Sequence, residues 1–280
     1  MPKLLGYRIV WTVHEVIPYN ACTSNDVSVA KILSRISDAK IVHSKSTISQ
    51  MRVMGLSTRN TILIPHGNYK NAYSDNLSAS ESRKRLKIKS HEMVILFFGL
   101  IRPYKGVDQL LDSFGNLKAK FPDLHLIIAG KSRDEKMSLQ IQQVAKNGNV
   151  IFVNDYIEDT EVGKFFKAAD VVCLPFKTTT TSGSALLALT FGRALVAPKV
   201  GSLVDLPSSV GYFYDPADST ALEKNIEKAI KNRQEVRIMS RNAKRYANSL
   251  SWSSIAEKTL QLYSSVLKPH VPRRYRDEND

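Results

Sequence analysis

The sequence is poor in cysteine and has no long apolar run. Its two cysteines, Cys22 and Cys173, lie far apart and fit no zinc-ligand spacing, so we expect buried thiols in a reducing compartment. The longest apolar run, residues 93–101, has the length of a strand and is too short to span a bilayer. The first residues carry no apolar core of signal-peptide length, so secretion is not expected. We expect a cytoplasmic protein.

Several functional motifs are also missing. Without a Gly-x-Gly-x-x-Gly fingerprint or a Tyr-x-x-x-Lys pair, a sugar-nucleotide epimerase is a distant alternative. No Asp-x-Asp motif is present, so the sequence implies no obligatory divalent metal and no metal-ligand residues. No segment resembles a recognition helix, an RNP motif or a zinc finger, and nucleic acid is not an expected partner.

Positive charge, in contrast, is plentiful. Forty basic residues face 26 acidic ones, which gives a net charge of +14. The densest basic segment, 228–245, is predicted to be helical. Two interpretations remain open: a solvated lysine-rich face, or attraction to an anionic membrane surface, which would make the protein peripheral at the inner face of the membrane.

Predicted strands and helices alternate along most of the chain. From residue 93 onward this pattern predicts a doubly wound α/β domain with a parallel, Rossmann-like sheet and ligand loops at the carboxyl ends of its strands. The three strands predicted before residue 66 make only part of a second α/β domain. The expected divisions are a partial amino-terminal domain (1–75), a serine-rich linker (76–92), the doubly wound domain (93–250) and a closing helix with a basic tail (251–280).

A polar loop opens a predicted helix near Ser182. The start of that helix, at Ser182, Gly183 and Ser184, offers unpaired backbone N–H groups, hydroxyls and a glycine that permits close approach, which suits a phosphate. The preceding Thr181 offers another hydroxyl. An ordinary serine N-cap is the alternative interpretation.

Two other loops are expected at the same edge of the sheet. The first, 99–106, contains Arg102 and Lys105, and two such cations at a strand end can neutralise two phosphate charges. The second is the turn at Gly130 and Lys131 after the next strand. We therefore expect a diphosphate site where these loops meet.

These loops carry a family resemblance. FFGLIRPYKGVDQLLDSF and PFKTTTTSGSALLALTFGRALVAPKVGS resemble the donor half of GT-B glycosyltransferases of the family-4 type, the glycosyl transferases group 1. In that family a Gly-x-x-x-x-x-Lys-Gly loop supplies cations to the diphosphate of a sugar nucleotide, and Gly99, Lys105 and Gly106 fit it. The usual arginine after the first glycine is Leu100 here, with Arg102 as the substitute. The resemblance covers most of residues 93–267 and implies a GT-B fold.

The resemblance also implies further site residues. Backbone groups near Tyr156 and Ile157 would face the nucleobase, and Trp252 matches a tryptophan that is typical of the family's closing helix.

The resemblance departs from the retaining members of the family. Those members carry two glutamates at the positions of Thr179 and Leu187, so their donor contacts and mechanism are not carried over to this chain. Its TSGSALLAL and GLIRPYKG motifs more closely resemble those of inverting exopolysaccharide and β-mannosyl-type transferases. An inverting enzyme needs a general base. His14 resembles the family's histidine after a Thr-Val pair and is the first candidate; Glu15 is the second.

The implied function is transfer of a hexose from a nucleotide diphosphate sugar, a donor substrate rather than a cofactor, to a lipid- or polysaccharide-linked glycan acceptor. Asp205 either binds an acceptor hydroxyl or lies exposed. The rival hypothesis is a donor-binding subunit that is inactive without a partner. A complete GT-B acceptor domain has more strands than this one. Either the chain is a natural half, for which we expect a second polypeptide or a second copy to associate through residues 1–70, or it is a truncated reading frame.

Overall fold

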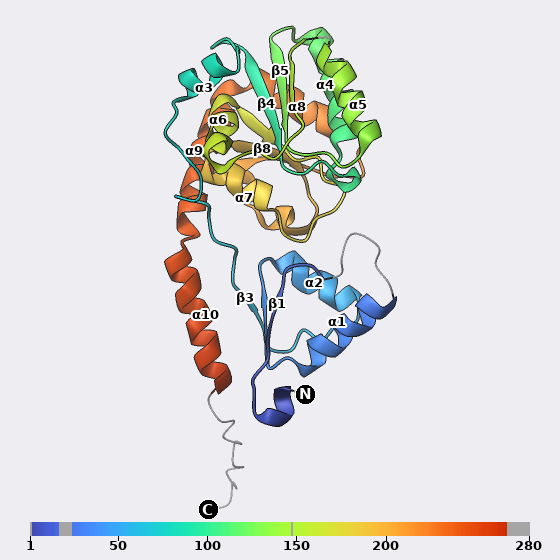
Figure 1. The fold of residues 1–280 in the computed structure, drawn as a ribbon, viewed down its shortest axis with the longest axis vertical. Coiled ribbons are helices and arrows are strands. Elements are labelled where there is room, and N and C mark those ends of the chain that lie inside the picture. Colours follow the sequence, from blue (N-terminus) through green and yellow to red (C-terminus); the bar gives the residue numbers. More distant parts are fainter. Residues whose placement is uncertain (1, 17–23, 147, 268–280) are drawn as a thin grey trace, which may run out of the picture.

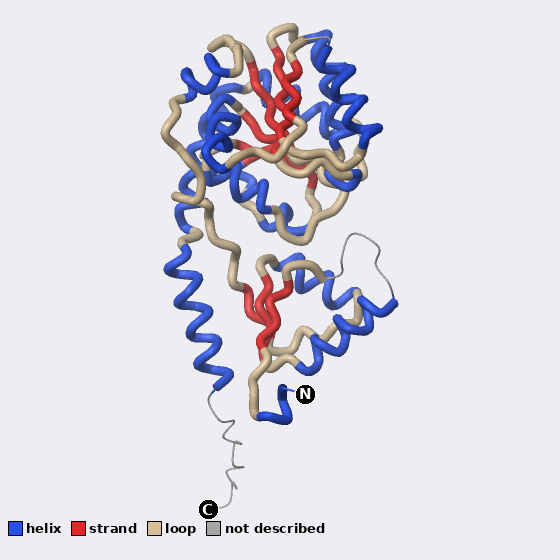
Figure 2. Tube along the Cα trace, viewed as in Figure 1, coloured by secondary structure: helices blue, strands red, loops and turns tan. Residues whose placement is uncertain are grey.

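Two separate parallel sheets organise the protein, as Figures 1 and 2 show. The computed structural model describes residues 2–16, 24–146 and 148–267. The small lobe has a three-stranded sheet in the order β1-β2-β3. Its elements are η1 (Pro2–Leu5), β1 (Val10–Val13), α1 (Ser24–Ile36), β2 (Ala39–Val42), α2 (Lys45–Val53) and β3 (Thr61–Leu63). Cys22 lies outside the described residues.

The large lobe has a six-stranded parallel sheet in the order β6-β5-β4-β7-β8-β9. Its strands are β4 (Met93–Phe98), β5 (Leu124–Ala129), β6 (Val150–Val153), β7 (Val171–Cys173), β8 (Ala194–Pro198) and β9 (Gly211–Tyr214). The chain builds outward from β4 to β6, then returns to the other side of β4 and builds outward again. This confirms the predicted doubly wound fold and creates a topological switch point between β4 and β7, where such folds bind ligands.

Helices cover both faces of this sheet. Figure 1 shows α4, α5 and α8 on one side and α3, α6, α7 and α9 on the other. Their bounds are α3 (Ala79–Arg85), α4 (Val107–Lys120), α5 (Glu135–Lys146), α6 (Asp159–Ala168), α7 (Gly183–Thr190), α8 (Ala221–Lys231) and α9 (Arg233–Ser249). Because both faces are covered, the central strands are apolar throughout: the first five residues of β4 and all of β7 and β8 are buried. Cys173 is one of these buried residues.

The last helix returns to the small lobe. Helix α10 (Trp252–Leu267) runs down from α9 beside β3 (Figure 1). Its Leu262 packs with Ala39, Ile41 and Ile64 against one face of the small sheet, while α1 and α2 cover the other face. Within the described ranges, every helix is too short or too polar to cross a lipid bilayer.

The segment 76–92, expected to be a linker, contains a helix. Ser78 and Glu81 form a capping box that starts α3, and the Arg83 guanidinium donates to the Ala168 and Glu92 carbonyls and to the Asp170 carboxylate. These contacts attach α3 to the large lobe. Ser78, one of the serines that make the segment look like a linker, is the N-cap of α3.

One apolar stripe of the small lobe is exposed. Val29, Ile32 and Ile36 on α1 have exposed fractions of 53%, 55% and 37%. They recur at helical spacing, so they lie on one face of α1.

Candidate functional site

Three strand ends meet at the switch point, as the sequence predicts. Gly99 follows β4 with φ of 122°, and a Cβ there would lie 3.1 Å from the Ser184 Oγ. Gly130 follows β5 with φ of 144°, and its Cβ would lie 2.1 Å from the Gly99 carbonyl oxygen. Only glycine fits this close approach of the two backbones. The loops after β4 and β5 and the start of α7 therefore form one continuous surface.

Lys105 occupies a half-buried position in this surface. It ends the short turn η2 (Pro103–Lys105), and Gly106 follows in the left-handed conformation. A Cβ on Gly106 would lie 1.9 Å from the Pro175 carbonyl oxygen, so the β4 loop packs tightly against the end of β7. The Lys105 Nζ lies 4.2 Å from the centre of the Phe176 ring, a cation–π distance.

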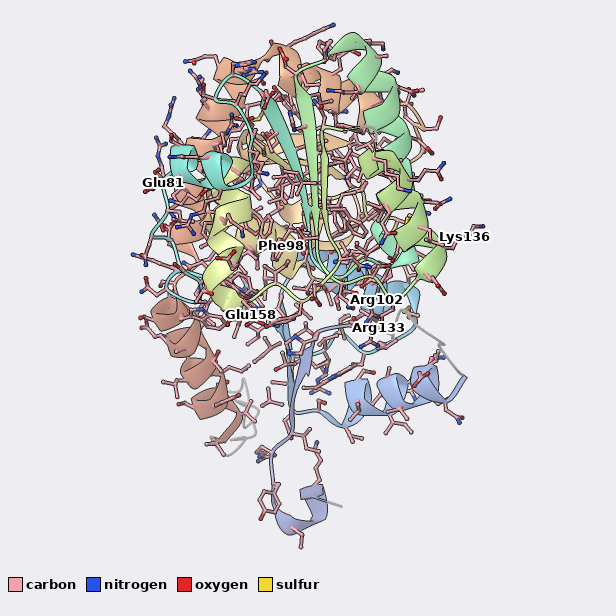
Figure 3. The ribbon with its side chains drawn as sticks, turned by 45° about the horizontal axis from the view of Figure 1, so that its top comes forward. Glu81, Phe98, Arg102, Arg133, Lys136 and Glu158 are labelled. Carbon is pink, nitrogen blue, oxygen red and sulfur yellow. The ribbon has the colours of Figure 1, made fainter. Side chains whose placement is uncertain are left out.

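Lys105 has no anionic partner among the described residues. Burial lowers the pKa of Lys105 to about 8, and the nearby Arg102 contributes to the same shift. Neither side chain forms an ion pair with a described carboxylate. Figure 3 shows Arg102, with Arg133, at the edge of the large lobe that faces the small lobe. Two cations held together without a counter-ion are suited to bind a dianion.

The start of α7 confirms the N-cap interpretation of Ser182, and the phosphate interpretation stays a prediction. Its Oγ accepts a hydrogen bond of 3.1 Å from the Ala185 N–H, so Ser182 is the N-cap. Gly183 and Ser184 begin the helix beyond it. The Tyr69 hydroxyl approaches this point, because a Cβ on Gly183 would lie 3.0 Å from it. The Thr181 Oγ1 is buried and has no hydrogen-bond partner in the part of the chain that the structure describes.

The other predicted donor residues surround this centre less tightly. Lys131 faces the Asp155 carboxylate at 3.5 Å in an exposed ion pair, so it already has an anionic neighbour, unlike Lys105. Tyr156 is 68% exposed, and its N–H donates to Asp155. Ile157 packs against the core of the large lobe. The role of Tyr156 and Ile157 toward a nucleobase stays a prediction.

Histidines gather on the small-lobe side. His14 and Glu15 are exposed after β1. The His14 ring lies 5.2 Å from that of His43, which lies 5.8 Å from that of His66. The His66 ring is in turn 5.5 Å from the ring of Trp252. The candidate base predicted from the sequence is therefore part of a histidine cluster.

Sequence reasoning missed His43, although it follows β2 as His14 follows β1. Its Nδ1 is 2.8 Å from the Ile64 carbonyl oxygen, and since a carbonyl only accepts, Nδ1 carries the proton. Its Nε2 is buried without a hydrogen-bond partner among the described residues. Burial lowers the pKa of His43, as do the nearby His14 and His66. His43 is thus neutral at pH 7, with a lone pair on Nε2.

A small pocket of about 60 Å³ lies between the two lobes, next to His43. His43 and His66 line it from the small lobe, and Thr181 and Asp205 line it from the large lobe. Asp205 is exposed, as one of its two interpretations predicted, and its carboxylate accepts hydrogen bonds from the Lys45 and Ser46 N–H groups at the start of α2; its role toward an acceptor hydroxyl stays a prediction. Asp205 therefore caps a helix of the opposite lobe.

The positions of the retaining family's glutamates are buried and uncharged. Thr179 and Leu187 are each 5% exposed. These two positions therefore contribute no carboxylate to the surface formed by Gly99, Lys105 and Ser184.

Known proteins share this architecture. The chain is 22% identical to a sucrose-phosphate synthase from Thermosynechococcus elongatus, with a TM-score of 0.79 over 94% of this chain and 70% of that one. It is 20% identical to Anabaena HepE, solved with UDP and glucose, with a TM-score of 0.80 over 94% of this chain and 73% of that one. Both likenesses show the fold, a GT-B arrangement.

A curated relative is more similar in sequence. GDP-mannose:glycolipid 4-beta-D-mannosyltransferase from Xanthomonas campestris is 27% identical over 210 residues, which are 75% of this chain and 55% of the relative. The chain thus spans about half the length of that relative. The family described as glycosyl transferases group 1 matches residues 78–246, a range that contains β4, β7 and the surface between them. With more than half of its residues in that match, the chain belongs to the glycosyl transferases group 1.

Proposed function

We propose that this chain binds a nucleotide diphosphate sugar and transfers its hexose to a lipid-linked or polysaccharide-linked glycan. The observation that supports this most is Lys105, a half-buried cation without an ionic partner among the described residues, at the switch point of a doubly wound sheet. Membership in the family favours a transferase over a subunit that only binds the donor.

In this proposal the diphosphate lies against the β4 loop. Lys105 and Arg102 neutralise the charge that develops on it when the bond to the sugar breaks. The N–H groups at the start of α7 and the Thr181 hydroxyl donate further hydrogen bonds. Gly99 and Gly130 leave room for close contact. Because side chains and helix N–H groups supply this stabilisation, the proposed reaction requires no divalent metal.

We further propose that the reaction inverts the anomeric centre. The acceptor oxygen attacks C1 of the sugar as the bond to the diphosphate breaks, and the acceptor proton moves to a base on the small lobe. His43, with its free Nε2, joins His14 and Glu15 as a candidate. The absence of glutamate at positions 179 and 187 favours inversion, as does the beta linkage named in the similar mannosyltransferase.

The proposed acceptor side includes a membrane. The similar mannosyltransferase acts on a glycolipid, according to its name, and the net charge of +14 would attract this chain to anionic lipid. We propose peripheral attachment at low ionic strength.

Nucleotide titration tests the donor site. The chain should bind UDP or GDP in buffer with EDTA, and Lys105→Ala should weaken that binding by roughly 10- to 100-fold for the loss of a charge-assisted contact. Lys136→Ala, an exposed lysine on α5, is the matched control and should change affinity less than twofold. Unchanged affinity in Lys105→Ala would remove the phosphate site, and binding that requires Mg²⁺ would refute the metal-independent proposal.

The stereochemistry can be tested without a known acceptor. A transferase that binds its donor also hydrolyses it slowly, and NMR identifies the first anomer released. Inversion predicts the opposite anomer to that of the donor, and His43→Ala should slow its release with little change in nucleotide affinity. A product of retained configuration would refute inversion.

A further inference from the structure

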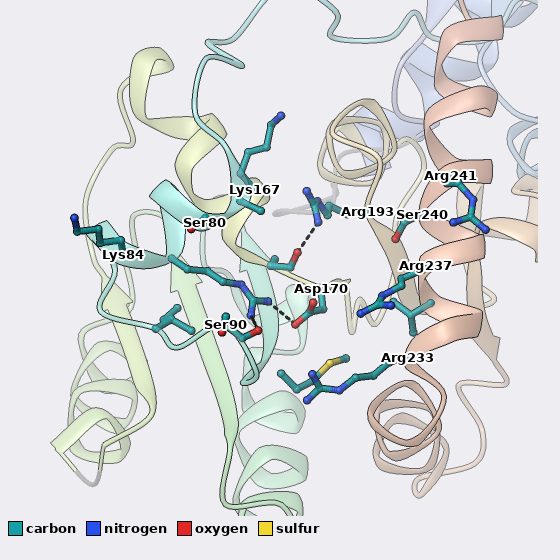
Figure 4. A pocket seen from close by; sticks show the side chains of 16 residues that line it. Ser80, Lys84, Ser90, Lys167, Asp170, Arg193, Arg233, Arg237, Ser240 and Arg241 are labelled. Carbon is teal, nitrogen blue, oxygen red and sulfur yellow. Dashed lines mark hydrogen bonds and ion pairs between the residues drawn. The ribbon is translucent and has the colours of Figure 1, made fainter.

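A second concave surface lies on the large lobe between α3 and α9. Its volume is about 740 Å³, and we call it the α3–α9 pocket (Figure 4). Met93 and Asp170, which lie at the amino ends of β4 and β7, contribute to its lining. None of the residues expected to bind the donor contributes to it.

The lining of the α3–α9 pocket is strongly basic. Seven basic side chains and a single carboxylate contribute to it. The basic residues are Arg83, Lys84, Lys167, Arg193, Arg233, Arg237 and Arg241. The carboxylate, Asp170, already accepts from the Arg83 guanidinium and the Val94 N–H, both at 2.8 Å. It therefore compensates Arg83 and also interacts with Arg193, and Lys167 forms an ion pair of 2.6 Å with Asp75; Lys84, Arg233, Arg237 and Arg241 form no ion pair with a described carboxylate.

Three of these cations come from one face of α9. Arg233, Arg237 and Arg241 follow one another at intervals of four residues, and Figure 4 shows them on the same side of the pocket. Like charges at this spacing repel and destabilise a helix. Arg233 donates to the His91 carbonyl, but Arg237 and Arg241 form no ion pair with any residue that the structure describes. A bound anion would relieve this repulsion.

Arg193 adds a buried donor. One of its N–H groups donates to the Ala169 carbonyl at 2.8 Å, while its Nε is buried without a hydrogen-bond partner among the described residues. Burial lowers the pKa of Arg193, and a guanidinium still remains charged at physiological pH. A buried, incompletely satisfied guanidinium is costly, and an anion in the pocket would reduce that cost.

The α3–α9 pocket is separate from the donor site. The donor loops follow the carboxyl ends of β4 and β7, whereas the pocket is reached at their amino ends. The six residues of β4 separate the two ends by about 20 Å, at about 3.3 Å per residue. One nucleotide sugar does not extend over both sites through the sheet.

We propose that the α3–α9 pocket binds a ligand with several clustered phosphate groups. Guanidinium groups match phosphate oxygens in bidentate geometry, and the hydroxyls of Ser80, Ser90 and Ser240 line the same pocket. So many cations around one cavity suit several phosphates rather than a single carboxylate. The ligand comes either from a multiply phosphorylated lipid headgroup or from a soluble polyphosphate, since both carry this chemistry. The proposal does not depend on the donor site.

Calorimetry with inorganic tripolyphosphate tests the shared chemistry. The chain is first saturated with UDP to occupy the donor site. We expect binding with a stoichiometry near one, and at least tenfold weaker binding for Arg237→Gln/Arg241→Gln. The control, Lys146→Gln/Lys258→Gln, removes two exposed charges outside the pocket and should change affinity less than twofold. Equal losses in both variants would show diffuse attraction and overturn the proposal, as would no binding. All four side chains are exposed, so folding is retained, and circular dichroism checks it.

Vesicle sedimentation distinguishes the two sources. A lipid source predicts that vesicles with a multiply phosphorylated headgroup sediment the chain, that Arg237→Gln/Arg241→Gln abolishes this, and that tripolyphosphate competes. A soluble source predicts tripolyphosphate binding, with no more sedimentation than that seen with vesicles that carry the same total charge on singly phosphorylated headgroups. Sedimentation that the arginine variant retains in full, together with unchanged calorimetry, would place phosphate binding elsewhere.

Discussion

Replacing Lys105 with methionine should make the protein more stable and, at the same time, weaken the proposed nucleotide binding. Lys105 is half-buried over the Phe176 ring and beside Arg102, without a carboxylate partner among the described residues. Folding must therefore place a charged ammonium in an unfavourable environment. Methionine keeps an unbranched apolar stem, and its sulfur makes favourable contacts with aromatic rings.

The pKa of Lys105 gives the magnitude. A decrease from 10.5 to about 8 corresponds to a destabilisation of about 3 kcal/mol, at about 1.4 kcal/mol per unit. Loss of the cation–π contact with Phe176 offsets about 0.5–2 kcal/mol of the gain. Lys105→Met should thus raise the free energy of unfolding by about 1–3 kcal/mol at pH 7.

The stability gain of Lys105→Met depends on pH, because it comes from removing an unfavourable charge. Below pH 8 Lys105 is protonated in both the folded and the unfolded chain, so the full cost is present. Between pH 8 and 10.5 the folded chain loses the proton first, and the cost disappears. The stability advantage of Lys105→Met should therefore shrink across that range.

Urea unfolding of both proteins, at pH 7 and again near pH 10, measures this difference. Lys136→Met, at an exposed position, controls for a general effect of methionine and should change stability by less than about 0.5 kcal/mol. If Lys105→Met has its unfolding midpoint at a lower urea concentration than the native sequence at pH 7, Lys105 stabilises the fold, and the argument that it is an uncompensated charge suited to bind an anion is wrong.

Three further predictions concern the glycine contact, the lobe contact and pH. Gly130→Ala should cost more than about 2 kcal/mol of stability, because its Cβ would meet the Gly99 carbonyl 2.1 Å away. Gly115→Ala, in open space within α4, should instead stabilise the protein by about 0.5–1 kcal/mol. Urea unfolding midpoints equal to that of the native sequence would contradict both. Asp205→Ala should weaken α2 by about 0.5–2 kcal/mol through loss of its cap, seen as faster amide exchange there; unchanged protection would refute that role. UDP affinity should fall as pH rises above about 8, where Lys105 loses its proton, and calorimetry between pH 7 and 9.5 should show no such fall in Lys105→Met.

The large lobe could be predicted from the sequence because its signals are local. Short apolar runs such as 93–98 are typical of strands that are covered on both sides, and alternation with helices then implies a parallel sheet. Gly99 and Lys105 could be placed near Ser184 because each follows the carboxyl end of a strand in one sheet.

What the sequence concealed depends on contacts between distant residues. Ser78 looks like part of a linker until Glu81 closes a capping box and Arg83 bonds to Asp170, 87 residues away. His43 looks like an ordinary strand end until the Ile64 carbonyl fixes its proton on Nδ1. Lys84 and three arginines of α9 line the α3–α9 pocket together. They lie about 150 residues apart in the sequence, so no local pattern predicts that they are neighbours.

The return of α10 to the small lobe has a consequence for the order of folding. The sheet made by β1, β2 and β3 is synthesised before the large lobe, yet one face of it is covered by Leu262, almost two hundred residues later. A nascent chain ending before Trp252 has a complete six-stranded sheet, while Ile41 and Ile64 remain without the helix that buries them. Domains usually fold in the order of their synthesis, but here the small lobe is made before the large lobe and completed after it. Until α10 has been made, this apolar face of the small lobe is exposed to water and open to chaperones.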